Sequence, residues 1–158
     1  MSELTIELVR DEPGRESFRE LLRRYQAGLP VDLRVHNLEE ELQALEGRYV
    51  LPASAMLLAR VDGVAAGCVV ASEFDAATLE IKRLYVEPEF RGSGAGRALM
   101  EAAIAFARER SHRRVVLDTQ HERLRAAYEL YCRLGFVPCP AYAPAEYANP
   151  TYMELVLA

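Results

Sequence analysis

The sequence has no apolar run of the roughly 18 residues that a helix needs to cross a bilayer. Its first residues lack the basic segment and apolar stretch of a secretory signal, so we expect none. Cys68, Cys132 and Cys139 are odd in number and show no CxxC spacing, which predicts free thiols in a reducing cytoplasm and argues against a metal site. A formal net charge of −5 is atypical of a general nucleic-acid binder. We therefore expect a cytoplasmic protein that binds no metal, nucleic acid or membrane.

The 158 residues suffice for one domain with its own core, and no linker or repeat divides them, so we expect a single domain over residues 1–158. We expect Asn37 to cap a helix and Asp62-Gly63 to join two strands as a hairpin. Periodicity and turn residues predict strands at 5–9, 55–61, 64–74, 78–86, 115–118, 136–138 and 151–157, and helices at 16–26, 38–47, from 95 onward and at 122–134. The order β-α-α-β-β-β-α-β-α-β-β predicts an α/β fold, with a mixed central sheet of about six to seven strands and helices on both faces.

The segment EFRGSGAGR (89–97) lies between the strand predicted at 78–86 and a helix. Glycines that alternate with small residues let backbone N–H groups approach an anion closely, and the dipole of the following helix adds to the attraction. Arg91 and Arg97 flank the glycines and supply formal positive charge. The segment therefore favours a phosphate or pyrophosphate ligand, although a glycine-rich turn with solvated arginines explains an isolated match equally well.

Two common phosphate-binding patterns do not fit this segment. A Walker loop ends in Lys followed by Ser or Thr, and the chain contains no such pair. A GxGxxG dinucleotide fingerprint needs a third glycine where Arg97 stands, and it follows the first strand of a βαβ unit, whereas this loop follows several strands. These departures argue against an ATP- or NAD-binding regulator.

Two segments resemble the GNAT N-acetyltransferase superfamily. LYVEPEFRGSGAGRALM (84–100) is similar to its acyl-coenzyme A motif, in which Arg or Gln, two residues, Gly, one residue and then Gly or Ala correspond to Arg91, Gly94 and Gly96. AAYELYCRLGF (126–136) is similar to a second family segment, in which an alanine is followed by a leucine-tyrosine pair and, after three further residues, by a glycine-phenylalanine pair. The element order also resembles the family fold, so the resemblance extends over essentially the whole chain.

The resemblance implies an enzyme that transfers an acetyl group from acetyl-CoA to a primary amine of a small molecule or peptide. The amine would attack the thioester directly in a ternary complex. Dimers are common among relatives, so the resemblance also implies a possible homodimer. A non-catalytic acyl-CoA-binding module on the same fold remains the alternative.

The resemblance also implies which residues bind the cofactor. In the family, the strand before the glycine loop splays from the next parallel strand, and pantetheine enters the gap. The backbone of Leu84, Tyr85 and Val86 would contact pantetheine and the thioester, and a strand N–H near Val86 would stabilise the charge that develops on the thioester oxygen. The pyrophosphate would be held by Arg91, Gly92, Ser93, Gly94, Ala95, Gly96 and Arg97.

Tyr131 matches the family's general-acid tyrosine and would protonate the departing thiolate. Tyr131 also falls at helical spacing on an apolar stripe, so the alternative is a tyrosine that only packs in the core. Tyr128, one turn earlier, would pack or form a wall of the cofactor site.

Glu80 is the candidate general base. It precedes Arg91 by 91 − 80 = 11 residues, the separation found for the catalytic glutamate of some relatives. Partial desolvation in a strand would raise its pKa and suit it to this role, but an ion pair with Lys82, two residues on, would weaken its basicity. The other candidates for the base are Glu73, Asp118 and His121.

One position departs from the family pattern. Leu124 stands seven residues before Tyr131, where many relatives carry an asparagine that helps to hold the cofactor. Thr119 and Gln120 are candidate substitutes.

The acceptor side is expected to consist of residues 29–42 and 138–152. Its acidic residues, Glu39, Glu40, Glu41 and Glu146, would suit a cationic amine or a basic peptide, or would form a solvated helix face. Its tyrosines, Tyr142, Tyr147 and Tyr152, would line an acceptor pocket or pack a hairpin. The identity of the acceptor is not predicted.

Overall fold

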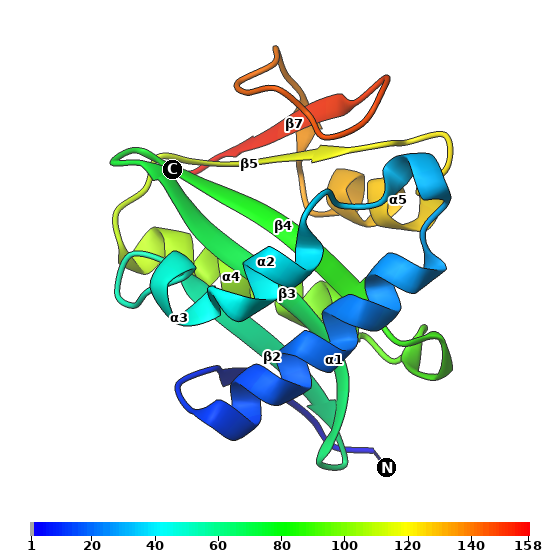
Figure 1. The fold of residues 1–158 in the computed structure, drawn as a ribbon. Coiled ribbons are helices and arrows are strands. Elements are labelled where there is room, and N and C mark those ends of the chain that lie inside the picture. The colour runs from blue at the N-terminus through cyan, green and yellow to red at the C-terminus, as the bar shows by residue number, and fades with distance from the viewer. Residues whose placement is uncertain (1) are drawn as a thin grey trace.

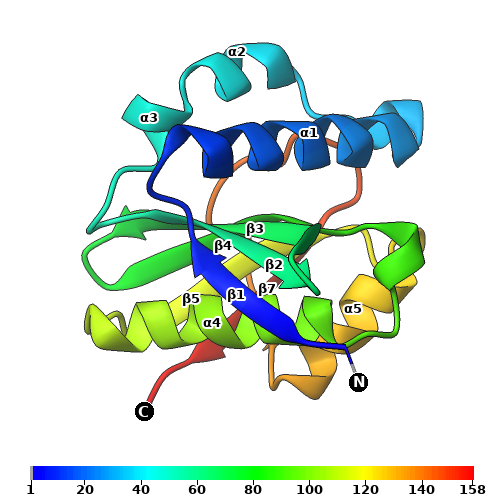
Figure 2. The ribbon, with the colours of Figure 1, turned by 90° about the horizontal axis from the view of Figure 1, so that it is seen from below.

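The computed structural model describes residues 2–158, which form a seven-stranded mixed sheet with helices on both faces (Figures 1 and 2). The elements are β1 (Leu4–Leu8), α1 (Glu12–Gly28), α2 (Leu38–Gln43), α3 (Leu45–Arg48), β2 (Ala55–Val61), β3 (Val64–Asp75), β4 (Thr78–Val86), α4 (Ala95–Glu109), β5 (Arg114–Thr119), α5 (Arg125–Arg133), β6 (Val137–Pro138) and β7 (Thr151–Val156). This order confirms the predicted α/β fold, except that the second helix is divided into α2 and α3. No helix within residues 2–158 is both long and apolar enough to cross a membrane.

The sheet has the order β1-β2-β3-β4-β5-β7-β6, and β4 and β5 form its one parallel pair among the described residues. Their ladder is short and ends where Glu80 pairs with Val116. Beyond that pair β5 continues to pair with β7 as far as Thr119, while β4 leaves its neighbour. The backbone of β4 from Ile81 to Val86 therefore has no strand partner on the β5 side. This divergence of two parallel strands agrees with the splay that the family resemblance implies.

A β-bulge lies in the diverging part of β4. Val70 and Cys68 of β3 pair with Lys82 and Tyr85, so one residue between the partners on β3 faces two on β4. Arg83, inside the bulge, has a φ of 62°, in the left-handed region that non-glycine residues rarely adopt. Such a bulge bends its strand and redirects the residues that follow it.

The side chain of Arg83 makes a buried ion pair with Glu41 of α2. Its Nε and Nη2 donate to the two carboxylate oxygens at 3.1 and 2.8 Å, and Glu41 also accepts from the hydroxyl of Tyr49. Both charged side chains are almost fully buried, with exposed fractions of 9% and 3%. Because removing one partner leaves an unpaired buried charge, this contact ties α2 to the bulge.

Two hydrophobic cores lie on opposite faces of the sheet. Figure 2 shows α1, α2 and α3 on one face and α4 and α5 on the other. Val70, opposite Lys82 on β3, belongs to the core beneath α1, whereas Leu79 and Ile81 belong to the core against α4. Side chains alternate along a strand, so Glu80 and Lys82 face the α1 and α2 side of the sheet.

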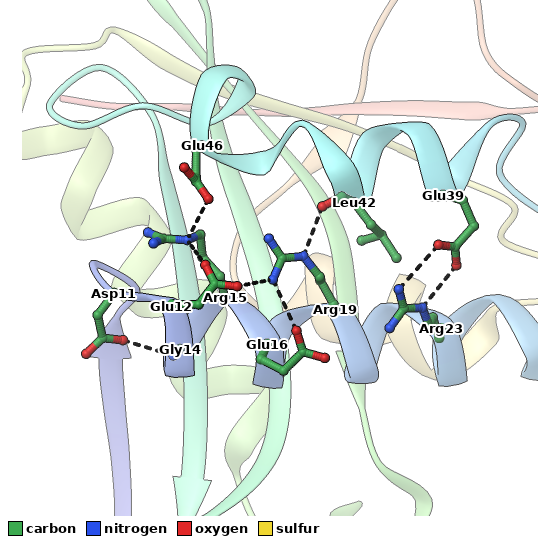
Figure 3. A network of polar contacts seen from close by, with 10 residues as sticks. All are labelled: Asp11, Glu12, Gly14, Arg15, Glu16, Arg19, Arg23, Glu39, Leu42 and Glu46. Atoms are coloured by element: carbon green, nitrogen blue, oxygen red, sulfur yellow. Dashed lines mark hydrogen bonds and ion pairs between the residues drawn. The ribbon is translucent and has the colours of Figure 1, made fainter.

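Arginines of α1 hold α2 and α3 in place, as Figure 3 shows. Arg19 donates to the carbonyl oxygen of Leu42 at 3.0 Å, and Arg23 forms an ion pair with Glu39. Arg15 similarly lies 3.4 Å from Glu46 of α3.

The two helix starts on this side differ from the predictions. Asp11 accepts a hydrogen bond from the N–H of Gly14, and α1 therefore begins at Glu12, earlier than predicted. Asn37 stands at the N-cap of α2 as predicted, but its backbone is left-handed and its side chain makes no capping hydrogen bond, so its predicted capping role is wrong.

Gly67 of β3 allows the close approach of β3 to the last residues of β4, within the part of β4 that has left β5. A Cβ atom at this position would lie 2.6 Å from the carbonyl oxygen of Tyr85. We expect Gly67→Ala to lower the free energy of unfolding by about 1–3 kcal/mol in urea denaturation, because the two strands must separate. Gly47→Ala is the matched control, since beyond its chain neighbours and the backbone of its own helix no atom lies within 4 Å of the added Cβ. Equal stability of the two variants would contradict this account.

Candidate active site

Two cavities adjoin at the divergence of β4 and β5. The larger, of about 790 Å³, lies over the glycine loop and the start of α4. The smaller, of about 300 Å³, lies over the α1 and α2 face of β4 and β5. Five residues in or directly beside α1, β4 and α5 line both cavities, and these are Tyr25, Leu29, Leu84, Leu124 and Ala127. A molecule in one cavity therefore lies next to a molecule in the other.

Nine of the ten predicted cofactor residues line the larger cavity: Leu84, Tyr85, Val86, Arg91, Gly92, Gly94, Ala95, Gly96 and Arg97. Ser93 is the exception. Its N–H donates to the carbonyl of Phe90 at 3.1 Å, and its hydroxyl accepts from the N–H of Ala95 at 3.3 Å. Ser93 thus shapes the loop from within.

Among the described residues, the loop has backbone N–H donors without internal acceptors. Gly92 and Gly94 have φ values of 84° and 91°, a conformation that favours glycine. Gly94 is the N-cap of α4 and provides no capping side chain. Within residues 2–158, the N–H groups of Gly96 and Arg97 in the first turn of α4 donate to no backbone acceptor. These donors and the helix dipole fit a diphosphate.

Positive charge is concentrated around the larger cavity, and no carboxylate of the described chain lines it. Five arginines do so: Arg91, Arg97, Arg123, Arg125 and Arg133. Arg97 and Arg125 pair with glutamates one turn along their helices, and Arg123 pairs with Asp32. A protein with a net charge of −5 therefore presents a locally cationic cavity, which fits a ligand with several phosphates.

The two candidate substitutes for the missing asparagine, in the segment before α5, differ in their positions. Leu124 is the N-cap of α5, makes no side-chain capping bond and lines both cavities. Thr119 lines the smaller cavity. Gln120 lines neither, because its side chain is buried and accepts from the N–H of Arg123 at 3.2 Å.

The smaller cavity brings together two carboxylates from neighbouring strands. Glu80 pairs with Val116 across the ladder, and Asp118 lies two residues further on, so both side chains are on one face. The hydroxyl of Tyr142 donates to Glu80 at 3.0 Å, and that of Tyr147 donates to Asp118 at 2.6 Å. Burial raises the pKa of both carboxyl groups above their ordinary values, although the charge of Lys82 and the tyrosine hydrogen bond oppose the shift at Glu80.

Tyr131 also lines the smaller cavity, from α5. It is 7% exposed and packs against Phe136 within the core of the α4 side. Tyr131 therefore combines both expected environments, since it packs in the core and also lines the cavity. Burial raises the pKa of the hydroxyl, so Tyr131 holds its proton at neutral pH and is able to donate it.

The other two candidate bases lie elsewhere. Glu73 is near His112 at 3.9 Å and lines neither cavity. The ring of His121 lies 2.6 Å from the hydroxyl of Thr151 and against the ring of Tyr128. Neither His121 nor Tyr128 lines either cavity, so Glu80 and Asp118 are the candidate bases able to reach a ligand here.

Both expected acceptor segments line the smaller cavity, through Leu29, Leu33 and Val35 in one and Ala143, Pro144, Glu146 and Tyr147 in the other. The run of three glutamates does not. Glu39 pairs with Arg23, and Glu41 is buried against Arg83. Glu40 is exposed to solvent. The hydroxyl of Tyr152 donates to the carbonyl oxygen of Ala143, and this hydrogen bond links two parts of the second segment.

The two kinds of buried carboxylate predict opposite effects of pH on stability. The pKa of Asp118 is raised in the folded state, so its ionisation opposes folding at neutral pH and this loss disappears as pH falls. We expect Asp118→Asn to have a melting temperature at least equal to wild type at pH 7.5, and to lose any advantage near pH 4.5.

Glu41→Gln is the contrasting variant. Burial alone raises the pKa of Glu41, but the ion pair with Arg83 outweighs it, and the pKa is lowered overall. Glu41 therefore stabilises the fold above the unfolded pKa, and this stability is lost as pH falls. We expect Glu41→Gln to cost about 3–5 kcal/mol at neutral pH. The same pH dependence for both variants would contradict the assignment.

Comparison with known proteins agrees with this geometry. The model of the acetyltransferase (GNAT) family matches residues 15–136. An uncharacterised N-acetyltransferase of Schizosaccharomyces pombe is 32% identical over 99% of this chain and 97% of its own length. An acetyltransferase of the GNAT family from Staphylococcus aureus has a TM-score of 0.82 at 16% identity, covering 99% of this chain and all of that one (100%).

A Salmonella typhimurium protein whose structure was solved with its cofactor acetyl-CoA has a TM-score of 0.78 at 21% identity, covering 98% of this chain and 94% of that one. The larger cavity has the backbone donors and arginines that such a cofactor requires. The chain is a member of the GNAT acetyltransferase family, an enzyme whose acetyl donor is acetyl-CoA.

Proposed function

We propose that the protein is an N-acetyltransferase that transfers the acetyl group of acetyl-CoA to a primary amine of a small molecule or peptide. The reaction proceeds by direct attack of the amine on the thioester in a ternary complex. The observation that carries the proposal is the junction of the two cavities, one rich in arginine and free backbone donors and the other holding Glu80, Asp118 and Tyr131.

Acetyl-CoA supplies the activated acyl group. The N–H groups of Gly92, Gly94, Gly96 and Arg97 bind its diphosphate, with the surrounding arginines as counter-charges. The unpaired edge of β4 from Leu84 to Val86 binds the pantetheine arm along the divergence. A backbone N–H near Val86 stabilises negative charge on the thioester oxygen.

Glu80 is the general base. An alkyl amine with a pKa of about 10.4 is mostly protonated near neutral pH and must lose a proton before it attacks. Desolvation raises the pKa of Glu80 and so makes its carboxylate a better proton acceptor. Asp118 is the second candidate for this role, since it shares the same face, cavity and direction of shift.

Tyr131 is the general acid. A thiol has a pKa of about 8.5, so the departing thiolate leaves more readily when it is protonated. The hydroxyl of Tyr131 keeps its proton at neutral pH because burial raises its pKa. Its place on α5, whose residues line both cavities, supports a role at their junction.

The cysteines support a cytoplasmic location as part of this proposal. Cys68, Cys132 and Cys139 are all free, as is usual in a reducing compartment.

A non-catalytic acyl-CoA-binding module is the alternative function. The hydroxyls of Tyr142 and Tyr147 already occupy one position on each carboxylate of the smaller cavity, and Leu124 replaces a cofactor-binding asparagine. Release of free thiol from acetyl-CoA in the presence of an amine panel separates the two functions, because a binding module releases none.

Replacing Tyr131 by phenylalanine tests the mechanism. We expect Tyr131→Phe to lower kcat by about 100-fold or more, since a general acid typically contributes at least this factor. The affinity for acetyl-CoA, measured by calorimetry, should change by less than about twofold, because the diphosphate contacts are elsewhere. Tyr128→Phe, one turn earlier and outside both cavities, is the matched control. Turnover of Tyr131→Phe at the wild-type rate would show that the acid is another group.

A further inference from the structure

Lys82 is the chain's only lysine, beside 18 arginines. It lies in β4, on the same sheet face as Glu80 and roughly 7 Å further along the strand, and it lines the smaller cavity. Its ammonium lies over the ring of Tyr49, 5.3 Å from the ring centroid. The one lysine of the protein is therefore next to the candidate base.

Lys82 is the cation in this cavity whose charge is available to a ligand. The other cation, Arg83, is held by both carboxylate oxygens of Glu41 and lies 3.6 Å from Glu146. By contrast, no carboxylate of residues 2–158 forms an ion pair with Lys82. A bound carboxylate would therefore be the first direct ion-pair partner of this partly buried ammonium.

The opposite charge is also present and unpaired. Glu80 and Asp118 each accept a tyrosine hydroxyl, and neither forms an ion pair with a described residue. The cavity thus combines one unpaired cation with two unpaired carboxylates. A simple amine satisfies only the carboxylates, whereas a molecule with both an ammonium and an acid group satisfies both.

The remaining lining limits the size and polarity of such a molecule. The volume of about 300 Å³ suits a single small molecule, and an apolar wall is formed by Leu29, Leu33 and Val35. A peptide N-terminus has no carboxylate beside its amine, and a protein lysine side chain has none either.

We propose that the acceptor is a free amino acid or a closely similar small zwitterion, whose carboxylate binds Lys82 and whose amine faces Glu80. This inference rests on the proposed function and names the substrate class for the same site. In the reaction, the amino nitrogen forms a bond to the acetyl carbon and the C–S bond breaks. The ammonium first gives one proton to Glu80, directly or through water, and becomes the attacking amine. The thiolate takes a proton from Tyr131, and the second proton of the nitrogen returns through water to the Tyr131 oxygen.

Matched acceptors test the proposal. A panel of free amino acids is assayed for thiol release, each beside its own carboxamide, for example leucine and leucinamide. We expect wild type to prefer acids to amides by about tenfold or more in kcat/KM, mainly through KM, because the amide loses a charged partner. Equal rates for acids and amides, or turnover of amides and simple amines alone, would overturn the proposal.

Variants of Lys82 assign that preference to one residue. In Lys82→Met the ratio of acid to amide should fall to about one, and Lys82→Arg should retain a preference because it keeps the charge. Arg108→Met, which removes an exposed cation of α4 outside both cavities, is the charge control and should keep the wild-type ratio. A ratio in Lys82→Met equal to that of wild type would exclude Lys82 as the carboxylate-binding residue.

A binding measurement separates failure of this inference from failure of the proposed function. Amino acids are titrated into the protein saturated with free coenzyme A, and the shift in melting temperature is compared with that from their amides. A shift specific to the acids and absent in Lys82→Met supports the zwitterion site, whether or not acetylation occurs. If that shift is seen without acetylation, the transferase mechanism is contradicted and the zwitterion site is not. No acid-specific shift, together with normal binding of acetyl-CoA, would overturn the zwitterion site alone.

Discussion

The site depends on the buried contact between Arg83 and Glu41. Arg83 adopts a left-handed backbone conformation inside a strand, which costs free energy and persists only where surrounding contacts hold it. Glu41 supplies those contacts through a bidentate ion pair, and Tyr49 satisfies the same carboxylate. The bulge bends β4 in the region where it leaves β5, and both cavities lie along that divergence. One ion pair therefore connects the acceptor-side helix to the edge on which the thioester is expected.

The second organising feature is a separation of charge. Arginines surround the larger cavity without a carboxylate among its lining residues, while the smaller cavity holds Glu80, Asp118 and Glu146. Phosphates are attracted to the first and an ammonium to the second. The shared lining at the junction is almost entirely apolar, with Leu84, Leu124 and Ala127 between the two fields. An uncharged acyl group fits this boundary.

The parts of the site predicted from the sequence are those formed by adjacent residues. The glycine loop from Arg91 to Arg97 is local, because its function depends on backbone conformation and the following helix. Arg133 and the arginines at the start of α5 were not predicted, since only packing of α5 brings them to the same cavity. A cluster of arginines in residues 123–133 was the available signal.

Glu41 shows why the rest of the site was beyond sequence reasoning. Within a run of three glutamates it has the same local pattern as its neighbours, yet it alone is buried. Its partner lies 42 residues away, since 83 − 41 = 42, at a bulge that leaves no local signature. The break between α2 and α3 depends similarly on contacts from α1, including the hydrogen bond of Arg19 to Leu42. Long-range packing decided each of these features.

The most direct test of the central claim is a calorimetric titration of acetyl-CoA into the purified protein, with ATP and NAD titrated in parallel. The account predicts micromolar or tighter binding of acetyl-CoA, equivalent to about −8 kcal/mol or better, and much weaker binding of the two nucleotides. ATP and NAD share the diphosphate but lack the pantetheine arm that the divergence of β4 and β5 would accommodate. Absence of acetyl-CoA binding, or equal affinity for all three ligands, would contradict the assignment of the larger cavity.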